Sequence, residues 1–109
     1  MAYDEDLAER VRDAISFRDA VSEREMFGGI TFMVGGNMAC GVIADELIVR
    51  LGAEEAERAL ADDGVRVFDF TGRPMRNWVV VERRHLEGDD ELAEWVDAGA
   101  AFASSLPPK

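Results

Sequence analysis

Apolar residues recur along the chain with two different periods, which allows helices and strands to be predicted separately. Leu7, Val11 and Ile15 lie on one helical face, with acids and arginines between them. The same spacing predicts an N-terminal, a middle and a C-terminal helix, over residues 4–18, 53–62 and 89–106. Asp89 or Asp90 is predicted to cap the third helix, because Asp is a preferred residue at that position.

Residues 26–44 carry no charge, in a chain that is 32% Asp, Glu, Lys and Arg. Five glycines interrupt this stretch, so a membrane-spanning helix is not expected. A Walker-type phosphate loop is also excluded, since no Lys follows the glycines. Residues 30–34 and 37–44 instead predict a β-hairpin that turns at Gly35 and Gly36. Both of its faces are largely apolar, which predicts a central hairpin or one covered on both sides by helices or a partner subunit.

Further extended segments follow the hairpin. Residues 47–51 predict a third strand, while residues 65–70 and 78–82 predict one or two more. Residues 71–77 are predicted as a loop, and residues 21–25 simply lead into the hairpin. The predicted fold class is α+β: an antiparallel sheet, with a meander of three strands plus one or two more, packs with three helices. At 109 residues the chain is predicted to form a single domain over residues 1–109.

The charge balance of the chain argues against direct binding to nucleic acid. Twelve basic and 23 acidic side chains give a net charge of −11, whereas phosphate binding needs clustered Lys and Arg. Residues 65–86 are the exception, because five arginines there oppose only Asp69 and Glu82. The absence of a targeting pattern and the single Cys40 predict a cytoplasmic protein without a disulfide or a membrane anchor.

No catalytic constellation is recognisable in the sequence. Cys40 lies between Ala39 and Gly41 and is predicted to be a small core residue. His85 is the only histidine and follows two arginines, so a surface position is expected rather than a metal site. We therefore expect no catalytic, metal or cofactor-binding residue, and no enzyme activity. The methionines other than Met1 share no metal-ligand spacing and are predicted to fill the core; they are Met26, Met33, Met38 and Met75.

One segment, residues 71–78, is a candidate ligand or partner site. Pro74 restricts the backbone of Arg73 to extended geometry. Arg73 and Arg76 would then stand beside Trp78, a combination typical of anion and partner sites. A connection between strands, with solvated arginines that offset nearby acids, explains the same residues and remains open.

Several short motifs resemble the N-terminal domain of the TfoX (Sxy) family. The motif residues are Met26-Phe27-Gly28-Gly29, the turn glycines Gly35 and Gly36, and Gly72-Arg73-Pro74-Met75, followed by Trp78. The resemblance covers nearly the whole chain. It implies an α+β domain with a central antiparallel sheet, no catalytic residues and no cofactor, in a family known for regulators of natural competence that work with a transcription activator.

Two functions are therefore expected as alternatives. The first is a non-enzymatic regulatory module that contacts a protein partner, such as a transcription regulator, or another copy of itself as a homodimer, through the sheet or hairpin face. The second is a small-ligand or anion-binding domain that uses the loop of residues 72–77, with Arg73 and Arg76 as its contacts.

Overall fold

The computed structural model describes residues 3–26, 28–70 and 72–107. In chain order their elements are α1 (Glu5–Ile15), β1 (Val21–Met26), β2 (Gly29–Val34), β3 (Asn37–Ile43), β4 (Glu46–Arg50), α2 (Ala53–Ala59), β5 (Val65–Phe70), β6 (Arg73–Val81), the 3-10 turn η1 (Arg83–His85) and α3 (Asp89–Ser104). The motif residue Phe27 lies outside the described residues.

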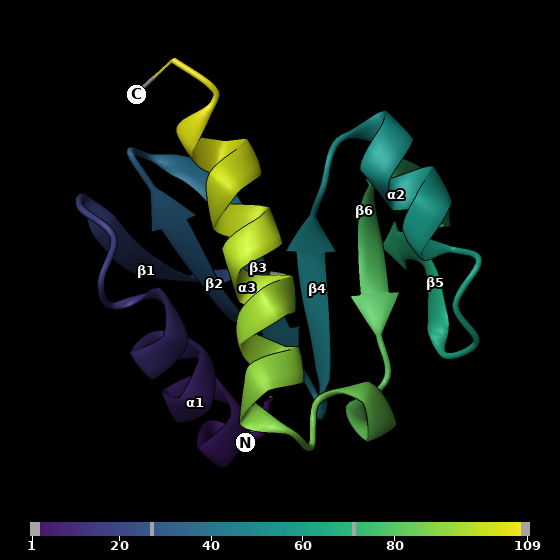
Figure 1. Cartoon of the computed structure of the whole chain (residues 1–109), viewed down its shortest axis with the longest axis horizontal. Coiled ribbons are helices and arrows are strands. Elements are labelled where there is room, and N and C mark those ends of the chain that lie inside the picture. The colour runs from purple at the N-terminus through teal and green to yellow at the C-terminus, as the bar shows by residue number, and fades with distance from the viewer. Residues whose placement is uncertain (1–2, 27, 71, 108–109) are drawn as a thin grey trace.

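The strands form one antiparallel sheet in the order β1-β2-β3-β4-β6-β5. Helices α1 and α3 lie across one face of this sheet, and α2 lies on the same side over β6 (Figure 1). The prediction of an α+β fold with three helices on an antiparallel sheet is confirmed. The hairpin is central, as one of the predicted alternatives had it, because β1 and β4 flank it. The other alternative, helices of the described chain over both faces, is not observed, since the helices cover one face only.

The β2–β3 hairpin forms where it was predicted. Gly35 and Gly36 join the strands with φ values of 60° and 83°, a region that glycine enters without a steric penalty. A Cβ on Gly41 of β3 would lie 2.8 Å from the carbonyl oxygen of Ile30 in β2. The glycines therefore serve backbone geometry within the sheet.

The main core lies between the helices and the sheet. Strand residues contribute to it alternately, so that Val79 and Val81 face the helices while Trp78 and Val80 face the other side. A second, smaller cluster on the helix-free face consists of Ile48, Phe68, Trp78 and Val80, with Met38, Ile43 and Met75 packed against it. The β4–β6–β5 half of this face is thus covered by its own side chains.

The predicted loop at residues 71–77 is wrong for most of its length. Strand β6 begins at Arg73, and Pro74 pairs with Asp69 of β5. Proline is tolerated here because β4 pairs with β6 only from Trp78 onward, so no second neighbour needs its missing N–H. The register then shifts, since Val67 pairs with Val79 but the next residue pairs with Met75.

Two other details differ from the sequence predictions. Strand β1 was not predicted, because its four central residues are polar and exposed and therefore lack the apolar alternation of a strand. Helix α3 is capped by Gly88 rather than by an aspartate, and Asp89, Asp90 and Glu91 occupy its first turn. Their negative charges favour the positive end of the helix dipole without a capping hydrogen bond.

Candidate functional site

A hollow of about 470 Å³ opens on the helix-free face over β1, β2 and β3. We call it the methionine pocket; its lining residues are Ser22, Arg24, Met26, Met33, Gly36, Met38 and Arg50. Three of the four methionines that were predicted to fill the core line it, and all three are only partly buried. Their placement corrects that prediction: they form the wall of a surface hollow rather than part of the main core.

Strand alternation explains how β1 contributes to this pocket. Val21 packs against the main core and Glu23 pairs with Arg12 of α1, so both face the helices. The alternate residues of the strand, Ser22 and Arg24, must therefore face the other side. Thr31 of β2 shares that side and is fully buried, with its hydroxyl donating to the carbonyl of Arg24 at 2.9 Å. This bond fixes the β1 backbone at the pocket.

The charges around the methionine pocket are unbalanced. Arg24 is exposed, and no described carboxylate pairs with it or with Arg50. The Nε atom of Arg50 is buried and has no hydrogen-bond partner, while its guanidinium carbon lies 5.4 Å from the ring centroid of Phe102. No acidic residue is among the described residues that line the pocket. Two arginines therefore line this hollow together with three methionines, in a chain with a net charge of −11.

The neighbouring acids of β1 are already neutralised or directed elsewhere. Glu23 receives two hydrogen bonds from Arg12, at 2.6 and 2.8 Å. These bonds lower the pKa of Glu23 and raise the pKa of Arg12. Glu25 has the same strand parity as Glu23 and pairs with Ile30, which belongs to the main core. Neither acid is placed to neutralise Arg24 across the pocket.

A second hollow on the same face lies over β4, β5 and β6, between Ile48, Phe68 and Val80. Its principal cation, Arg66, donates to both carboxylate oxygens of Glu46, at 3.0 and 2.6 Å. This pairing raises the pKa of Arg66. Because the arginine already has a bidentate partner, this hollow offers an external anion less than the methionine pocket does.

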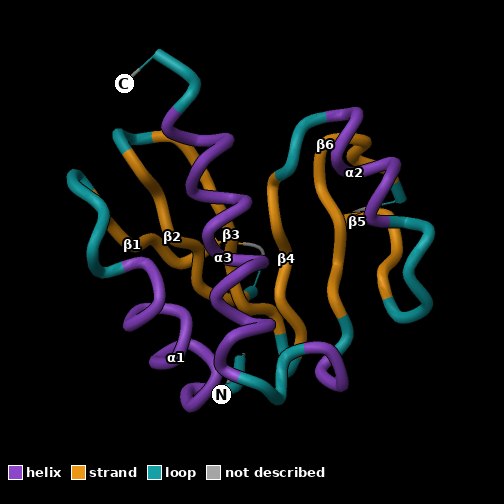
Figure 2. Tube along the Cα trace, in the orientation of Figure 1, coloured by secondary structure: helices purple, strands orange, loops and turns teal. Residues whose placement is uncertain are grey.

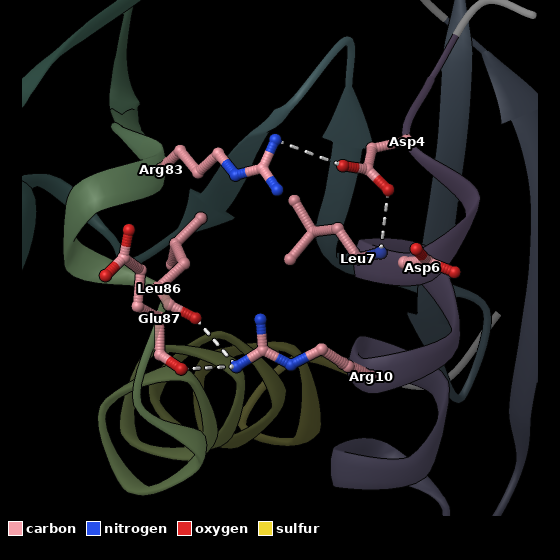
Figure 3. Close-up of a pocket in the computed structure, with 7 residues that line it drawn as sticks. All are labelled: Asp4, Asp6, Leu7, Arg10, Arg83, Leu86 and Glu87. Carbon is pink, nitrogen blue, oxygen red and sulfur yellow. Dashed lines mark hydrogen bonds and ion pairs between the residues drawn. The ribbon is translucent and has the colours of Figure 1, made fainter.

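A third hollow, shown in Figure 3, lies where the start of α1 meets η1. Arg10 reaches across it and donates to the carbonyl oxygens of Leu86 and Glu87, at 2.7 and 3.3 Å. Asp4 accepts from the backbone of Leu7 and lies 3.6 Å from Arg83. Both arginines that line this hollow are therefore engaged across it, so we interpret it as a clasp between α1 and the chain before α3.

The sequence-predicted site is only partly visible. Arg73 and Arg76 lie in β6, and their side chains are outside the described part of the structure. Trp78 is 6% exposed and packs against Phe68, with ring centroids 6.1 Å apart. The tryptophan therefore has a packing role in the second cluster. Ligand or partner contact by these three residues stays a prediction.

The other motif residues have backbone or packing positions. Met26 is the last residue of β1 and pairs with Gly29, the first residue of β2. Gly28, between them, has a φ of 76°. A Cβ on Gly29 would lie 2.0 Å from the carbonyl oxygen of Val42, so only glycine fits between the strands. Met75 packs against the second cluster from β6.

Cys40 is enclosed in the core, and His85 bridges two segments of the chain. Cys40 is fully buried, as predicted, and burial raises the pKa of its thiol to about 12. The two ring nitrogens of His85 face the carbonyl oxygen of Asp63 at 2.5 Å and the carboxylate of Glu91 at 3.3 Å. Within the described residues there is no cluster of three His, Cys, Asp or Glu side chains that could hold a metal ion.

Sequence reasoning missed Arg24 and Arg50 as site residues. The signal for Arg24 was present in residues 21–26, where Val21 and Met26 flank alternating charges. It could have been read only if that segment had first been recognised as an edge strand. Arg50 ends a strand that was predicted, but nothing in the sequence indicates that it borders a hollow formed by three other strands.

No helix among the described residues is long and apolar enough to cross a membrane. Comparison with curated proteins and with solved structures returned no match. A family model described as the TfoX N-terminal domain matches residues 13–103, from within α1 to the last turn of α3. That match spans the whole sheet and the methionine pocket, and it agrees with the motif resemblance. The chain belongs to the TfoX N-terminal domain family.

Proposed function

We propose that this domain is a non-enzymatic regulatory module that binds a protein partner through the methionine pocket. The partner presents a segment in which a carboxylate stands beside an apolar side chain. The observation that supports this function best is the pair of unneutralised arginines, Arg24 and Arg50, beside a methionine wall. Family membership supports a competence-regulator-like role for the domain.

The chemistry of the pocket suits such a segment. A guanidinium binds a carboxylate through two parallel hydrogen bonds, and Arg50 holds a donor that has no acceptor in the described structure. Methionine side chains are flexible and polarisable, which allows Met33 and Met38 to adapt to different apolar groups. The hollow of about 470 Å³ is within the size range of pockets that enclose a ligand group.

The proposal can be tested with synthetic peptides. We expect a fluorescent peptide that combines Asp or Glu with Leu to bind, and its Lys-substituted counterpart not to bind, in an anisotropy titration. Arg24→Gln and Arg50→Gln should each weaken binding about fivefold, the upper range for one exposed charge pair. Arg58→Gln is the matched control, because Arg58 lies on α2 and already pairs with Glu55. Thermal melting of each variant verifies that it is folded.

Two results would contradict the proposal. One is equal binding of the acidic and basic peptides, since the charge of the pocket would then have no role. The other is a concentration-dependent dimer in sedimentation velocity that Arg24→Gln abolishes. That result would make a second copy of this chain the occupant, as in the self-association considered from the sequence, instead of a different protein.

A further inference from the structure

The outer edge of β1 runs directly beside the methionine pocket. Strand β1 is the first strand in the sheet order and pairs with β2 on one side. No strand of the described chain pairs with its other side, which forms the left edge of the sheet in Figure 2. An open edge carries unpaired backbone N–H and C=O groups and can accept another strand.

The hydrogen bonds around β1 show which backbone groups are available. The carbonyl of Ala20 accepts from Gly35, and the carbonyl of Arg24 accepts from the Thr31 hydroxyl, so both point toward β2. Backbone groups of an antiparallel strand alternate between its two neighbours. The N–H and C=O groups of Glu23 and Glu25 therefore point outward, away from β2.

The side chains of β1 present opposite charges on its two faces. Arg24 stands on the pocket side, whereas Glu23 and Glu25 stand on the helix side. A strand added at this edge would place its own side chains alternately beside Arg24 and beside the two glutamates. Complementarity requires acidic or apolar residues on the pocket side and basic residues at the positions between them, above all beside Glu25, because Glu23 already accepts from Arg12.

We propose that the partner of this domain binds as an added β-strand on the outer edge of β1, with its pocket-side residues acidic or apolar and its alternate residues basic. This inference rests on the proposed function and specifies how the partner engages the same site. Backbone hydrogen bonds to Glu23 and Glu25 supply part of the affinity, and the methionine pocket selects the side chain inserted beside Arg24.

The charge pattern disfavours a second copy of β1 as the added strand. Outward-facing residues pair with outward-facing residues when two antiparallel edges meet. If two copies of β1 paired antiparallel over most of their length, Glu23 or Glu25 of one copy would stand opposite a glutamate of the other. Like charges directly opposite each other are destabilising. The edge is therefore suited to a different sequence with the complementary alternation.

Two peptides of identical composition test the alternation. In one, Lys alternates with Asp and Leu; in the other, the lysines are grouped at one end. Both carry the same net charge, so nonspecific attraction to the acidic chain is matched. We expect the alternating peptide to bind about tenfold more tightly in an anisotropy titration, since two matched cross-strand charge pairs of about 0.7 kcal/mol each account for such a factor. Equal affinities would overturn strand addition.

A proline substitution separates strand addition from simple docking. Glu25→Pro removes an outward N–H and leaves the bonds from Arg24 to β2 in place. We expect it to weaken binding of the alternating peptide about tenfold, while Glu25→Ala, which keeps the N–H, has a smaller effect. Full binding by Glu25→Pro together with weak binding by Arg24→Gln would overturn strand addition but retain the pocket. Full binding by both would overturn the proposed function as well.

Amide exchange decides the question independently of whether the proline variant folds. In the free wild-type protein the outward amides of Glu23 and Glu25 should exchange rapidly, whereas the inward amide of Arg24 should be protected. Saturation with the alternating peptide should slow exchange at Glu23 and Glu25. Unchanged exchange at both amides in the saturated complex would contradict an added strand.

Discussion

The arginines of this domain differ in whether a carboxylate pairs with them. Arg12 and Arg66 each face a carboxylate at hydrogen-bonding distance, and these pairs hold α1 to β1 and β4 to β5. Arg24 and Arg50 have no such partner among the described residues. Because paired arginines are already satisfied, the two unmatched ones are the residues where an external anion gains most.

Cys40 allows a test of burial at one residue. Its thiol is fully enclosed between sheet and helices, and burial raises its pKa to about 12. The thiolate that reacts with disulfide reagents is therefore scarce and inaccessible in the folded protein. We expect labelling by such a reagent to be slow and to accelerate in parallel with unfolding as denaturant is added. Rapid labelling without denaturant would contradict the packing of β3.

His85 predicts a pH dependence of stability. Both ring nitrogens face acceptors, namely the Asp63 carbonyl and the Glu91 carboxylate, and the hydrogen bond to Asp63 is the main cause of a raised pKa. A histidine whose folded pKa exceeds its unfolded value contributes stability that is fully present below about pH 6.5 and is lost as the pH rises through the folded pKa.

Denaturant unfolding of the wild type and His85→Gln between pH 5.5 and 8 measures this contribution. The difference in unfolding free energy between the two proteins should shrink as the pH rises, since Gln cannot become charged. Glu23 does not interfere, because its lowered pKa places its titration below this window. A free-energy difference that is constant or grows with pH would contradict a stabilising protonation of His85 between Asp63 and Glu91.

At the scale of elements, the sequence predicted the helices and the hairpin turn, but it did not predict the edge strand β1 or the start of β6. The glycine pair at residues 35 and 36 reverses the chain for a local steric reason, so the hairpin was predicted from sequence alone. Strand β1 was missed because an edge strand needs no apolar alternation on its exposed residues. The start of β6 was missed because Pro74 is a strand breaker in most settings, and only the sheet order shows that its N–H is not needed.

Gly99 tests the contact between α3 and the sheet. A Cβ at this position would lie 2.4 Å from the carbonyl oxygen of Ala39, so the helix approaches β3 closely at a point without a side chain. We expect Gly99→Ala to destabilise the domain by about 1–3 kcal/mol, because overpacking outweighs the gain in helix propensity. Gly88→Ala controls for the steric effect alone, because the nearest atom to its Cβ is 4.0 Å away and any loss there reflects a weaker N-cap. Denaturant midpoints that show no loss for Gly99→Ala would contradict this packing.

At the scale of the whole molecule, the helices divide the sheet into two unequal faces. One face is the main core, while the other is closed by its own side chains over β4, β5 and β6 and remains hollow over β1, β2 and β3. The sequence indicated that both faces of the hairpin were apolar, but it could not indicate which face the helices would leave uncovered. The methionine pocket follows from that asymmetry, so its position required the tertiary arrangement.

The methionine methyl groups provide the most direct test of the proposed site. Met26, Met33 and Met38 line the pocket. Met38 also touches the second cluster, against which Met75 packs without lining the pocket. In a protein labelled with ¹³C at the methionine methyls, titration with the alternating peptide should shift the Met33 and Met38 resonances most. The Met75 resonance should move least, and Arg24→Gln should reduce all the shifts. Saturable binding that leaves Met33 and Met38 unshifted would contradict the assignment of this pocket as the partner site.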